Sequence, residues 1–316
     1  MKDSYLLAGA TGLIGSALLR RLVSEGNRVT CPVRNIEKAK GLFDEDLFNK
    51  VQWLETPLET YLQRIDEDID YIIHCASPTS GKYMVEYPVE TYEFIIESTR
   101  YLLQYACKHG VKGMVYVSSL EYYGQNYGDD IITEDFEGYI DPGSPRSSYP
   151  LGKRAAEYLC AAYASEYKVP VKIARLTQTF GPGISIDDNR VFAQFAKSAI
   201  NKEDIILHTD GESAKPYCHV YDCVEAILTI LQKGRSGEAY NVANEATYIS
   251  IKDMAEFVQR NFNPEHKVVI QKRDDMGYAP VTKLRLSTQK LRDLGWKPRY
   301  GLYEMYANLI VNINEK

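Results

Sequence analysis

The sequence predicts an α/β protein built on a doubly wound parallel sheet, and two patterns in the chain lead to this prediction. Short apolar runs, typical of strands buried on both faces, alternate with helical patterns through the first half of the chain. The first of these runs is followed at once by a glycine-rich turn and a helix. With 316 residues and 45% hydrophobic content, the chain can bury one large core or two modest ones.

The expected elements can be placed in chain order. The first strand lies at residues 4–8, and its helix continues through Ala17–Val23 until Gly26 stops it. Further buried strands are expected at residues 29–33, 51–54, 71–74, 113–117 and 171–174. A crossing helix over residues 90–109 presents an apolar face of Ile95, Ile96, Leu102, Leu103 and Ala106. Beyond Arg175 the pattern becomes irregular, and loops are expected at residues 181–183 and 187–189.

The glycine-rich turn after the first strand is typical of a dinucleotide site. Its glycines have a G-x-x-G-x-x-G spacing, where G-x-G-x-x-G is commoner. Gly9 allows a tight turn, Gly12 lets the backbone approach a pyrophosphate, and Gly15 lets the helix pack on the strand. The free N–H groups at the helix N-terminus favour phosphates there. We therefore expect a Rossmann-type cofactor site made by Gly9, Thr11, Gly12, Leu13, Ile14 and Gly15.

A tyrosine and a lysine stand four residues apart in Tyr149-Pro150-Leu151-Gly152-Lys153, at the start of a later helix. Ser147 or Ser148 is expected to cap this helix, and Pro150 suits its first position. Lys153 then lies on the same helix face as the Tyr149 ring. A nearby cation favours the phenolate, so it would lower the phenol's pKa from about 10 and ease proton transfer near neutral pH. A surface pair on a helix is the alternative that this spacing alone leaves open.

Composition excludes several classes of partner. The net charge of −6 and the pI near 5.5 argue against nucleic acid or an anionic membrane. No apolar run approaches 18 residues, and residues 1–3 lead directly into the first strand, so neither a membrane span nor a signal peptide is expected. The six cysteines lack a C-x-x-C pair, which indicates reduced thiols in a cytoplasmic protein. No metal is expected, because the histidines and acidic residues lack ligand spacing.

With both motifs in view, the chain from Tyr5 to about Trp296 resembles the extended short-chain dehydrogenase/reductase family, in its epimerase/dehydratase branch. Residues 115–124 are similar to the family's strand with a catalytic Ser or Thr, five residues before the Gly of a Tyr-Gly pair. The resemblance implies that role for Ser119. Residues 74–79, 145–149, 186–191 and 217–222 resemble UDP-glucuronate decarboxylases in particular. In those enzymes a Glu two residues after the Ser or Thr takes part, which implies a role for Glu121.

The resemblance also implies an organisation and further site residues. A dinucleotide-binding domain is expected over residues 1–175 and a smaller mixed α/β substrate lobe mainly over 176–316, with a return to the larger domain around 220–231. A homodimer is expected. Ala76 is expected at the cofactor, and the residues expected at the substrate are Ser77, Thr177, Gln178, Arg190, Lys215 and Arg285.

The end of the second strand indicates which dinucleotide is bound. Enzymes that prefer NAD usually place an acidic residue there, which accepts hydrogen bonds from the ribose hydroxyls. This chain has Arg34 at that place, with Lys38 four residues later. A planar cation suits a 2′-phosphate, so we expect NADP(H). NAD(H) stays open if Arg34 is only a solvated residue at a strand end.

Two departures from the decarboxylases bear on the reaction. They have an Arg where this chain has Lys215, and a lysine cannot make the bidentate clamp that an arginine makes on a carboxylate. After Arg175 the family usually has a Phe-Asn pair. This chain has Thr177 and Gln178 in place of that pair. Placement of the substrate should therefore differ, and decarboxylation of a glucuronate is not the favoured reaction.

The expected mechanism uses one hydride and one proton. Tyr149 exchanges a proton with a sugar hydroxyl or ketone oxygen while the cofactor exchanges hydride with the same carbon. Ser119 holds the reacting oxygen, and Lys153 also binds the nicotinamide ribose. Glu121 is either a second acid/base or a surface carboxylate, and His74 and His219 are expected only to satisfy local hydrogen bonds.

The favoured function is NADPH-linked reduction of a keto sugar carried by a nucleotide. A redox-neutral epimerase or decarboxylase with bound NAD stays open, as does a sugar-phosphate reductase that forms a polyol. A non-catalytic protein that senses dinucleotides and binds a partner is a further alternative. Such sensors typically lose the Tyr/Lys pair, which this chain keeps together with Ser119.

Overall fold

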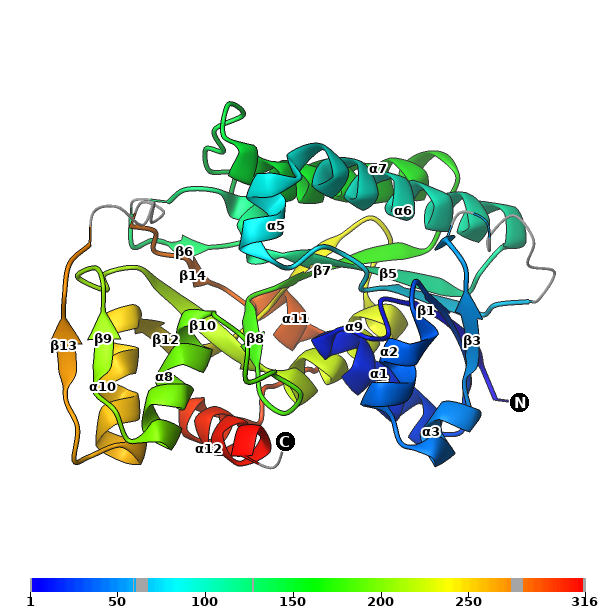
Figure 1. The fold of residues 1–316 in the computed structure, drawn as a ribbon. Helices are drawn as coiled ribbons and strands as arrows, with labels where there is room; N and C mark the ends of the chain where they lie inside the picture. The colour runs from blue at the N-terminus through cyan, green and yellow to red at the C-terminus, as the bar shows by residue number, and fades with distance from the viewer. Residues whose placement is uncertain (1, 59, 61–67, 127, 274–280, 315–316) are drawn as a thin grey trace.

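The computed structural model describes residues 2–58, 60, 68–126, 128–273 and 281–314, and it confirms the α/β class. Its centre is a parallel sheet of seven strands in the order β11-β7-β5-β4-β1-β2-β3 (Figure 1). The five further strands that the sequence predicts all lie in this sheet. Its strands are β1 (Ser4–Ala8), β2 (Arg28–Val33), β3 (Gln52–Glu55), β4 (Tyr71–His74), β5 (Gly113–Ser119), β7 (Val171–Leu176) and β11 (Ala239–Val242).

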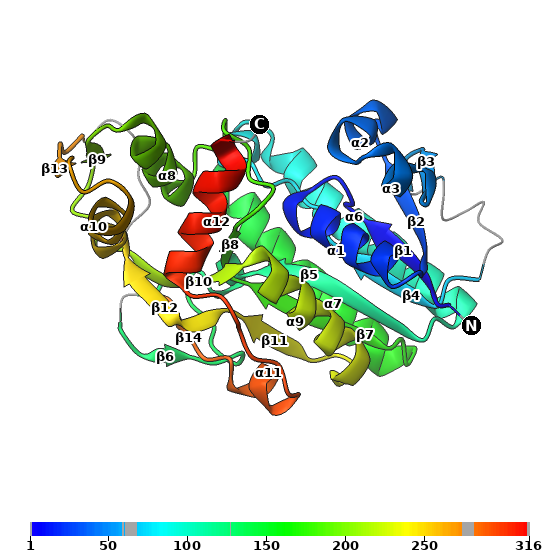
Figure 2. The same cartoon turned by 90° about the horizontal axis from the view of Figure 1, so that it is seen from below.

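Helices cover both faces of the sheet. α6 and α7 pack side by side on one face, over a core that includes Ile95, Leu102 and Ala106 (Figure 1). α1 and α9 lie together on the other face, as the view from below shows (Figure 2). The helices around the sheet are α1 (Leu13–Ser24), α2 (Ile36–Leu42), α3 (Glu45–Asn49), α5 (Gly81–Glu86), α6 (Pro88–His109), α7 (Ser148–Glu166), α9 (Val220–Lys233) and α11 (Gln289–Asp293).

A smaller lobe stands beside the carboxyl ends of the strands. Its three-stranded sheet has the order β12-β10-β8, and its core packs Phe180, Phe192 and Tyr306 against one another. Two short parallel pairs, β9 with β13 and β6 with β14, extend it. Its elements are β6 (Ile131–Ile132), β8 (Gln178–Phe180), α8 (Val191–Asn201), β9 (Ile205–Leu207), β10 (Ala214–His219), β12 (Asn244–Ser250), α10 (Ile251–Phe262), β13 (Val268–Ile270), β14 (Arg285–Leu286) and α12 (Leu302–Asn314).

Three elements beyond residue 175 belong to the larger sheet and its cover: α9, β11 and α11, which packs on β11. α9 packs on β5 and β7, within the segment where the sequence predicts the chain to return. β11 then pairs with β7 as the seventh strand, which the sequence analysis did not predict because its four residues carry little pattern. The domain limit at residue 175 stays a prediction.

The start of α7 differs from its sequence prediction. α7 begins at Ser148, so Pro150 is its third residue and not its first. Neither serine caps it: Ser147 makes no capping hydrogen bond, and Ser148 donates instead to the carbonyl of Met84 at 3.3 Å. A short 3-10 turn, η2 (Pro145–Ser147), leads directly into the helix. The backbone is therefore already helical where α7 begins, and no side chain caps the helix.

The strand order places a switch point between β1 and β4. From β1 the chain builds outward through β2 and β3, whereas from β4 it builds the other way through β5 and β7. Connections that leave in opposite directions open a crevice at the carboxyl ends of the two strands, where ligands of such sheets bind. Gly9 follows β1 there, and Cys75 and Ala76 follow β4.

Close packing at this crevice requires glycine. A Cβ on Gly15 would lie 2.1 Å from the carbonyl oxygen of Gly9, and one on Gly9 would lie 2.6 Å from the amide nitrogen of Ala76. Gly9 also has φ of +91°, a left-handed conformation that side chains rarely adopt. α1 can therefore approach the end of β1 only because these residues have no side chain.

We predict that Gly15→Ala lowers stability by about 1–3 kcal/mol, because its new methyl group meets backbone that cannot move aside. Gly41→Ala on α2 is the matched control, since a Cβ there meets nothing within 4 Å and alanine favours a helix. Thermal unfolding of both variants checks this. Equal melting temperatures for Gly15→Ala and Gly41→Ala would contradict it.

Candidate active site

The cradle between β1 and α1 has the form expected for a phosphate site. Gly12 stands at the N-cap of α1 and makes no side-chain capping bond, and the first turn has no acidic residue. The N–H groups of this turn and the helix dipole therefore favour an anion. Thr11, Leu13 and Ile14 are half-buried or exposed around it, and Ala76 is half-buried opposite Gly9. These residues fit the pyrophosphate of a dinucleotide.

The smaller lobe reaches this cradle. Leu13 packs against the lobe's core, and a Cβ on Gly183 would lie 3.3 Å from its side chain. The loop after β8 therefore lies against the start of α1. This contact makes the cradle part of the border between the large sheet and the lobe.

Arg34 follows β2 at the place where a dinucleotide's adenosine ribose is expected. It is exposed, and its guanidinium makes no hydrogen bond or ion pair to another described residue. Asn35 accepts a hydrogen bond from the Lys38 amide at 3.1 Å and so caps α2. The nearby carboxylate of Glu55 already accepts the Ile36 amide at 3.0 Å. The cation at this strand end is therefore free to meet a ligand.

Tyr149 and Lys153 lie on the face of α7 that packs against the sheet. Both are buried, and the Lys153 Nζ lies 5.5 Å from the Tyr149 ring centroid. Lys153 donates to the Val117 carbonyl of β5 at 2.9 Å. Burial is the largest influence on this ammonium and lowers the pKa of Lys153 to about 8. The structure therefore places Lys153 beside the Tyr149 ring, as the four-residue spacing predicts.

The pKa of Tyr149 moves in the direction opposite to the sequence prediction. Burial raises it most, and the charge of Glu121 raises it further, while Ser119, Arg146 and Ser77 act to lower it. The net pKa is well above that of a free tyrosine. Desolvation of the phenolate therefore outweighs the neighbouring cations in this state, so Tyr149 is held as a proton donor.

Two hydroxyl groups face the Tyr149 phenol. Ser119 ends β5 and is half-buried, and its Oγ accepts the Glu121 amide at 3.2 Å. Ser77 follows β4, and its Oγ is buried. Both lower the pKa of Tyr149 and therefore lie close to it. A buried hydroxyl beside the phenol is suited to a ligand's oxygen.

Glu121 lies in a charged cluster with Arg146 and Lys215. The sequence predicted Glu121 and Lys215 as site residues but not Arg146. Glu121 pairs with Arg146 at 2.7 Å, and the Arg146 guanidinium lies 5.9 Å from the Tyr149 ring centroid. The Arg146 Nη1 is buried without a partner among the described residues. Burial lowers the pKa of Lys215 on β10, and the charges of Glu121 and Arg146 also act on it. Glu121, Arg146 and Lys215 thus form one charged cluster, and its Arg146 lies beside the Tyr149 ring.

Arg146 is the residue of this cluster that sequence reasoning missed. It stands in the stretch 145–149 that carries the family resemblance, so a signal was present. Its partner Glu121 is 25 residues away in the chain, however, and only the fold brings the two together.

The other residues predicted to meet substrate are spread more widely. Thr177 is buried and donates to the Pro216 carbonyl at 2.5 Å, so its hydroxyl is already occupied. Gln178 begins β8 and is half-buried. Arg190 is paired with Asp188 at 2.5 Å at the start of α8. Arg285 lies on β14 with its guanidinium 5.6 Å from the Tyr248 ring centroid.

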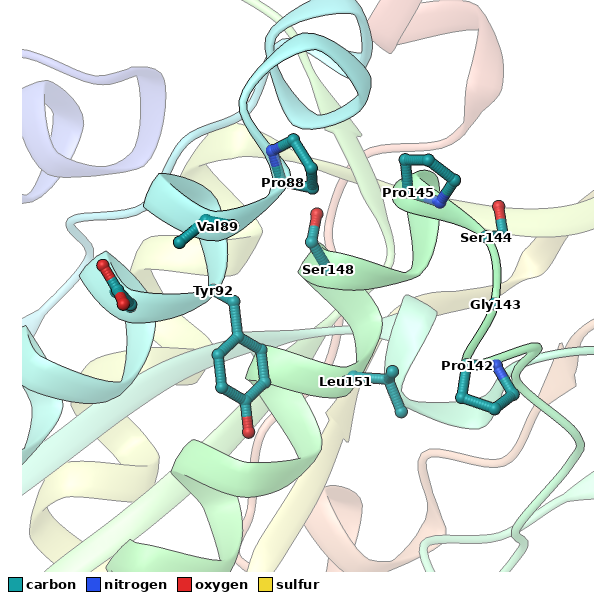
Figure 3. A pocket seen from close by; sticks show the side chains of 10 residues that line it. Pro88, Val89, Tyr92, Pro142, Gly143, Ser144, Pro145, Ser148 and Leu151 are labelled. Carbon is teal, nitrogen blue, oxygen red and sulfur yellow. The ribbon is translucent and has the colours of Figure 1, made fainter.

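Two surface cavities lie away from the Tyr149 phenol. One, of about 420 Å³, is lined by Arg285, Arg292 and Pro216 among others. The other, of about 380 Å³, is a hollow between the N-terminal parts of α6 and α7, with Tyr92 and Leu151 on its walls (Figure 3). Neither lining includes Tyr149, Lys153 or Ser119. The structure therefore does not bring Arg285 into the cluster around Tyr149.

The predictions about histidine, cysteine and metal can be set beside the structure. The His74 imidazole lies 3.2 Å from the Ser98 hydroxyl, and His219 accepts the Tyr221 amide at 3.2 Å. All six cysteines are free thiols. Among the described residues, no group of three His, Cys, Asp or Glu is placed to hold a metal ion, and no helix there is both long and apolar enough to cross a bilayer.

Known proteins resemble this chain over almost its whole length. Residues 5–243 match the NAD dependent epimerase/dehydratase family. UDP-glucuronic acid decarboxylase 5 of Arabidopsis thaliana is 29% identical over 310 residues, covering 95% of this chain and 86% of that protein. These matches confirm the resemblance found in the sequence.

Two solved structures have the same fold. UDP-glucose 4-epimerase with UDP-glucose from Thermotoga maritima has a TM-score of 0.85 at 22% identity, covering 99% of each chain. UDP-glucuronic acid 4-epimerase from Bacillus cereus in complex with NAD has a TM-score of 0.79 at 22% identity, also covering 99% of each chain.

The depressed pKa of Lys153 predicts a pH dependence of stability. Above pH 8 the folded protein releases the Lys153 proton, which the unfolded chain keeps until about pH 10.4. Since the unfolded state binds more protons in this window, wild type should gain stability relative to Lys153→Met as the pH rises from 8 to 10.4. Thermal melts of both proteins measure this. A constant difference in melting temperature across the window would show that Lys153 titrates normally.

Proposed function

Since the chain belongs to the NAD-dependent epimerase/dehydratase family, we propose that it acts on a nucleotide-activated sugar with a nicotinamide dinucleotide as cofactor. The observation that carries this proposal is the buried Tyr149 with Lys153 and Ser119 at the carboxyl edge of the sheet, beside the glycine cradle. The names of related proteins add support, because a plant relative is a UDP-glucuronic acid decarboxylase and similar folds include UDP-sugar epimerases.

The chain's own residues have separate tasks in holding the two ligands. The glycine turn and the start of α1 receive the pyrophosphate, while Lys153 binds the nicotinamide ribose. The bound nicotinamide supplies or accepts the hydride. Ser119 and Ser77 donate hydrogen bonds to the reacting sugar oxygen and hold it within reach of the Tyr149 phenol.

Tyr149 then moves the proton. A phenol whose pKa is raised by burial keeps its proton until a carbonyl oxygen gains negative charge beside it. In the reducing direction the ketone carbon gains the hydride, the oxygen takes the Tyr149 proton, and solvent returns a proton to the phenolate. Lys153 stabilises that phenolate in the interval, because its ammonium lies beside the ring.

We favour NADPH-linked reduction of a keto sugar as the net reaction. The support is the unpaired Arg34, whose guanidinium suits a 2′-phosphate. Enzymes that return the hydride to the same sugar commonly keep NAD bound, whereas net reduction draws on NADPH. Thr177 and Gln178 in place of Phe-Asn, and Lys215 in place of Arg, also separate this chain from the decarboxylase pattern.

A redox-neutral epimerase or decarboxylase is the second candidate, and the charged cluster favours it. Arg146 has an unpaired Nη1, and the half-buried Lys215 has no hydrogen bond or ion pair to another described residue. Arg146 beside the phenol and Lys215 in the same charged cluster could together hold the carboxylate of a sugar acid. The related Bacillus cereus epimerase was solved with NAD, which fits this candidate as well.

The remaining expectations about the whole protein stay predictions. A homodimer and a cytoplasmic location are among them. The outer faces of α6 and α7 carry exposed apolar residues, including Val89, Tyr92 and Tyr158, which agrees with a partner on that side. Figure 3 shows the hollow that Tyr92 and Leu151 form there.

Cofactor choice gives a direct test of Arg34. Calorimetry should show tighter binding of NADP(H) than NAD(H) by wild type, and Arg34→Asp should reverse the order because its carboxylate repels the 2′-phosphate and accepts from a free hydroxyl. Lys108→Asp, an equal charge change on α6, should leave the order as it is. Preference of wild type for NAD(H) would contradict the assignment.

The net reaction can be followed through the nicotinamide absorbance. With a panel of 4-keto nucleotide sugars, wild type should consume one NADPH for each sugar reduced, as resolved by NMR. Tyr149→Phe should lower kcat by roughly a hundredfold or more with NADPH binding kept, and Tyr158→Phe on the exposed face of α7 should not. Conversion of UDP-glucuronate or UDP-glucose without loss of NADPH would favour the redox-neutral candidate instead.

A further inference from the structure

A row of polar side chains crosses three neighbouring strands just below the Tyr149 site. Ser118 of β5 is the register partner of Arg175 on β7, which is in turn the partner of Asn241 on β11. All three are buried. Buried polar residues on three neighbouring strands are costly unless they are bonded to one another. Packing alone therefore does not explain why polar residues occupy these three buried positions.

Glu157 of α7 connects this row to the helix that carries Tyr149. Its carboxylate accepts hydrogen bonds from two nitrogens of Arg175, from Nη2 at 2.7 Å and from Nε at 3.0 Å. Ser118 Oγ donates to the same carboxylate at 2.5 Å. Glu157 stands four residues after Lys153 and eight after Tyr149, so all three share the buried face of α7.

Arg175 continues from Glu157 to the turn that follows Ser119. This turn, η1 (Leu120–Tyr123), contains Glu121. Arg175 donates to the Tyr123 hydroxyl at 3.1 Å, and its guanidinium lies 3.4 Å from the Tyr122 ring centroid. The Tyr123 hydroxyl donates onward to Asn241 at 2.6 Å. One arginine thus joins α7, β5, β11 and η1.

Stability alone does not explain an ion pair at this place. The side chains of Glu157 and Arg175 are each only 5% exposed. Removing two charges from water costs several kcal/mol for each ion, and apolar replacements of a buried pair are often as stable or more so. What apolar residues would lack is the set of directed bonds to Ser118, Tyr123 and the Glu134 carbonyl.

We infer that Glu157 and Arg175 are positioning residues, which fix the end of β5 and η1 against α7 so that Ser119 and Glu121 face Tyr149. Arg154 acts beside them on the outer side of η1. It donates to the Tyr122 carbonyl at 2.6 Å and to the Gly138 carbonyl at 2.7 Å. Two arginines therefore bind η1: Arg175 of β7 donates to the Tyr123 hydroxyl, and Arg154 of α7 donates to the Tyr122 carbonyl. This role applies to any reaction that uses the Ser119–Tyr149 pair.

The test separates positioning from stability with a double variant. Glu157→Met with Arg175→Met removes both charges and keeps similar volume, so its melting temperature should fall less than that of Arg175→Met alone, which leaves the Glu157 carboxylate buried without its partner. Its kcat with the sugar that wild type reduces should fall by roughly ten- to a hundredfold, because a catalytic group displaced by about 1 Å can cost that much. The Kd for NADPH should change less than about twofold, because the glycine cradle is untouched.

Two further proteins complete the test. Tyr123→Phe deletes only the hydroxyl between Arg175 and Asn241, so it should fold normally and lower kcat without changing the Kd for NADPH. Leu47→Ala on α3 is a core variant far from Tyr149, and it should lower the melting temperature with kcat kept. If the double variant does not fold, Tyr123→Phe decides alone.

A spectroscopic measurement removes the dependence on a known substrate. With tyrosine labelled by carbon-13 at Cζ, the Tyr149 signal is identified by its absence in Tyr149→Phe, and it should move in the double variant and in Tyr123→Phe but not in Leu47→Ala. Wild-type kcat together with an unmoved Tyr149 signal in the double variant or in Tyr123→Phe would overturn the inference. Should wild type turn over none of the sugars, the proposed function fails while this signal still tests the positioning role.

Discussion

The buried face of α7 is the feature on which the rest of the site depends. Tyr149, Lys153 and Glu157 follow one another at four-residue spacing, so a single helix points a phenol, an ammonium and a carboxylate at the ends of β5 and β7. None of these groups is stable in a dry interior without a partner. Their partners, Ser119, the Val117 carbonyl and Arg175, all come from those two strands. The helix and the sheet edge therefore fix each other.

The order of the strands brings the cofactor cradle to the same place. β1 and β4 are neighbours at the switch point, so the turn after β1 meets the segment after β4 without any long connection. Burial raises the pKa of the Cys75 thiol in that segment and the charge of Lys153 acts to lower it, so Lys153 of α7 lies near the segment after β4. A ligand that spans the crevice would thus reach Tyr149 at one end while Gly12 holds its phosphates.

The cationic side chains around the crevice differ in whether another residue already pairs with them. Arg190 is paired with Asp188, and Arg175 with Glu157, so neither has a free charge for a ligand. Arg34 and Lys215 make no ion pair with another described residue, and Arg146 keeps one nitrogen unpaired. These last three residues therefore keep polar groups that no other described residue pairs. Arg146 lies near the Tyr149 ring, Lys215 belongs to the same charged cluster, and Arg34 lies at the far strand end, after β2.

The sequence by itself determined six of the seven strands of the large sheet, the glycine turn and the placement of Lys153 beside Tyr149, because each is a local pattern. Apolar runs predict strands, Gly9 and Gly15 predict close approach, and a four-residue spacing places two side chains on one helix face. It could not show that β11 joins the sheet, that Arg146 meets Glu121, or that burial raises the pKa of Tyr149. Those facts depend on residues far apart in the chain and on the exclusion of water between them, and only the packed tertiary structure decides both.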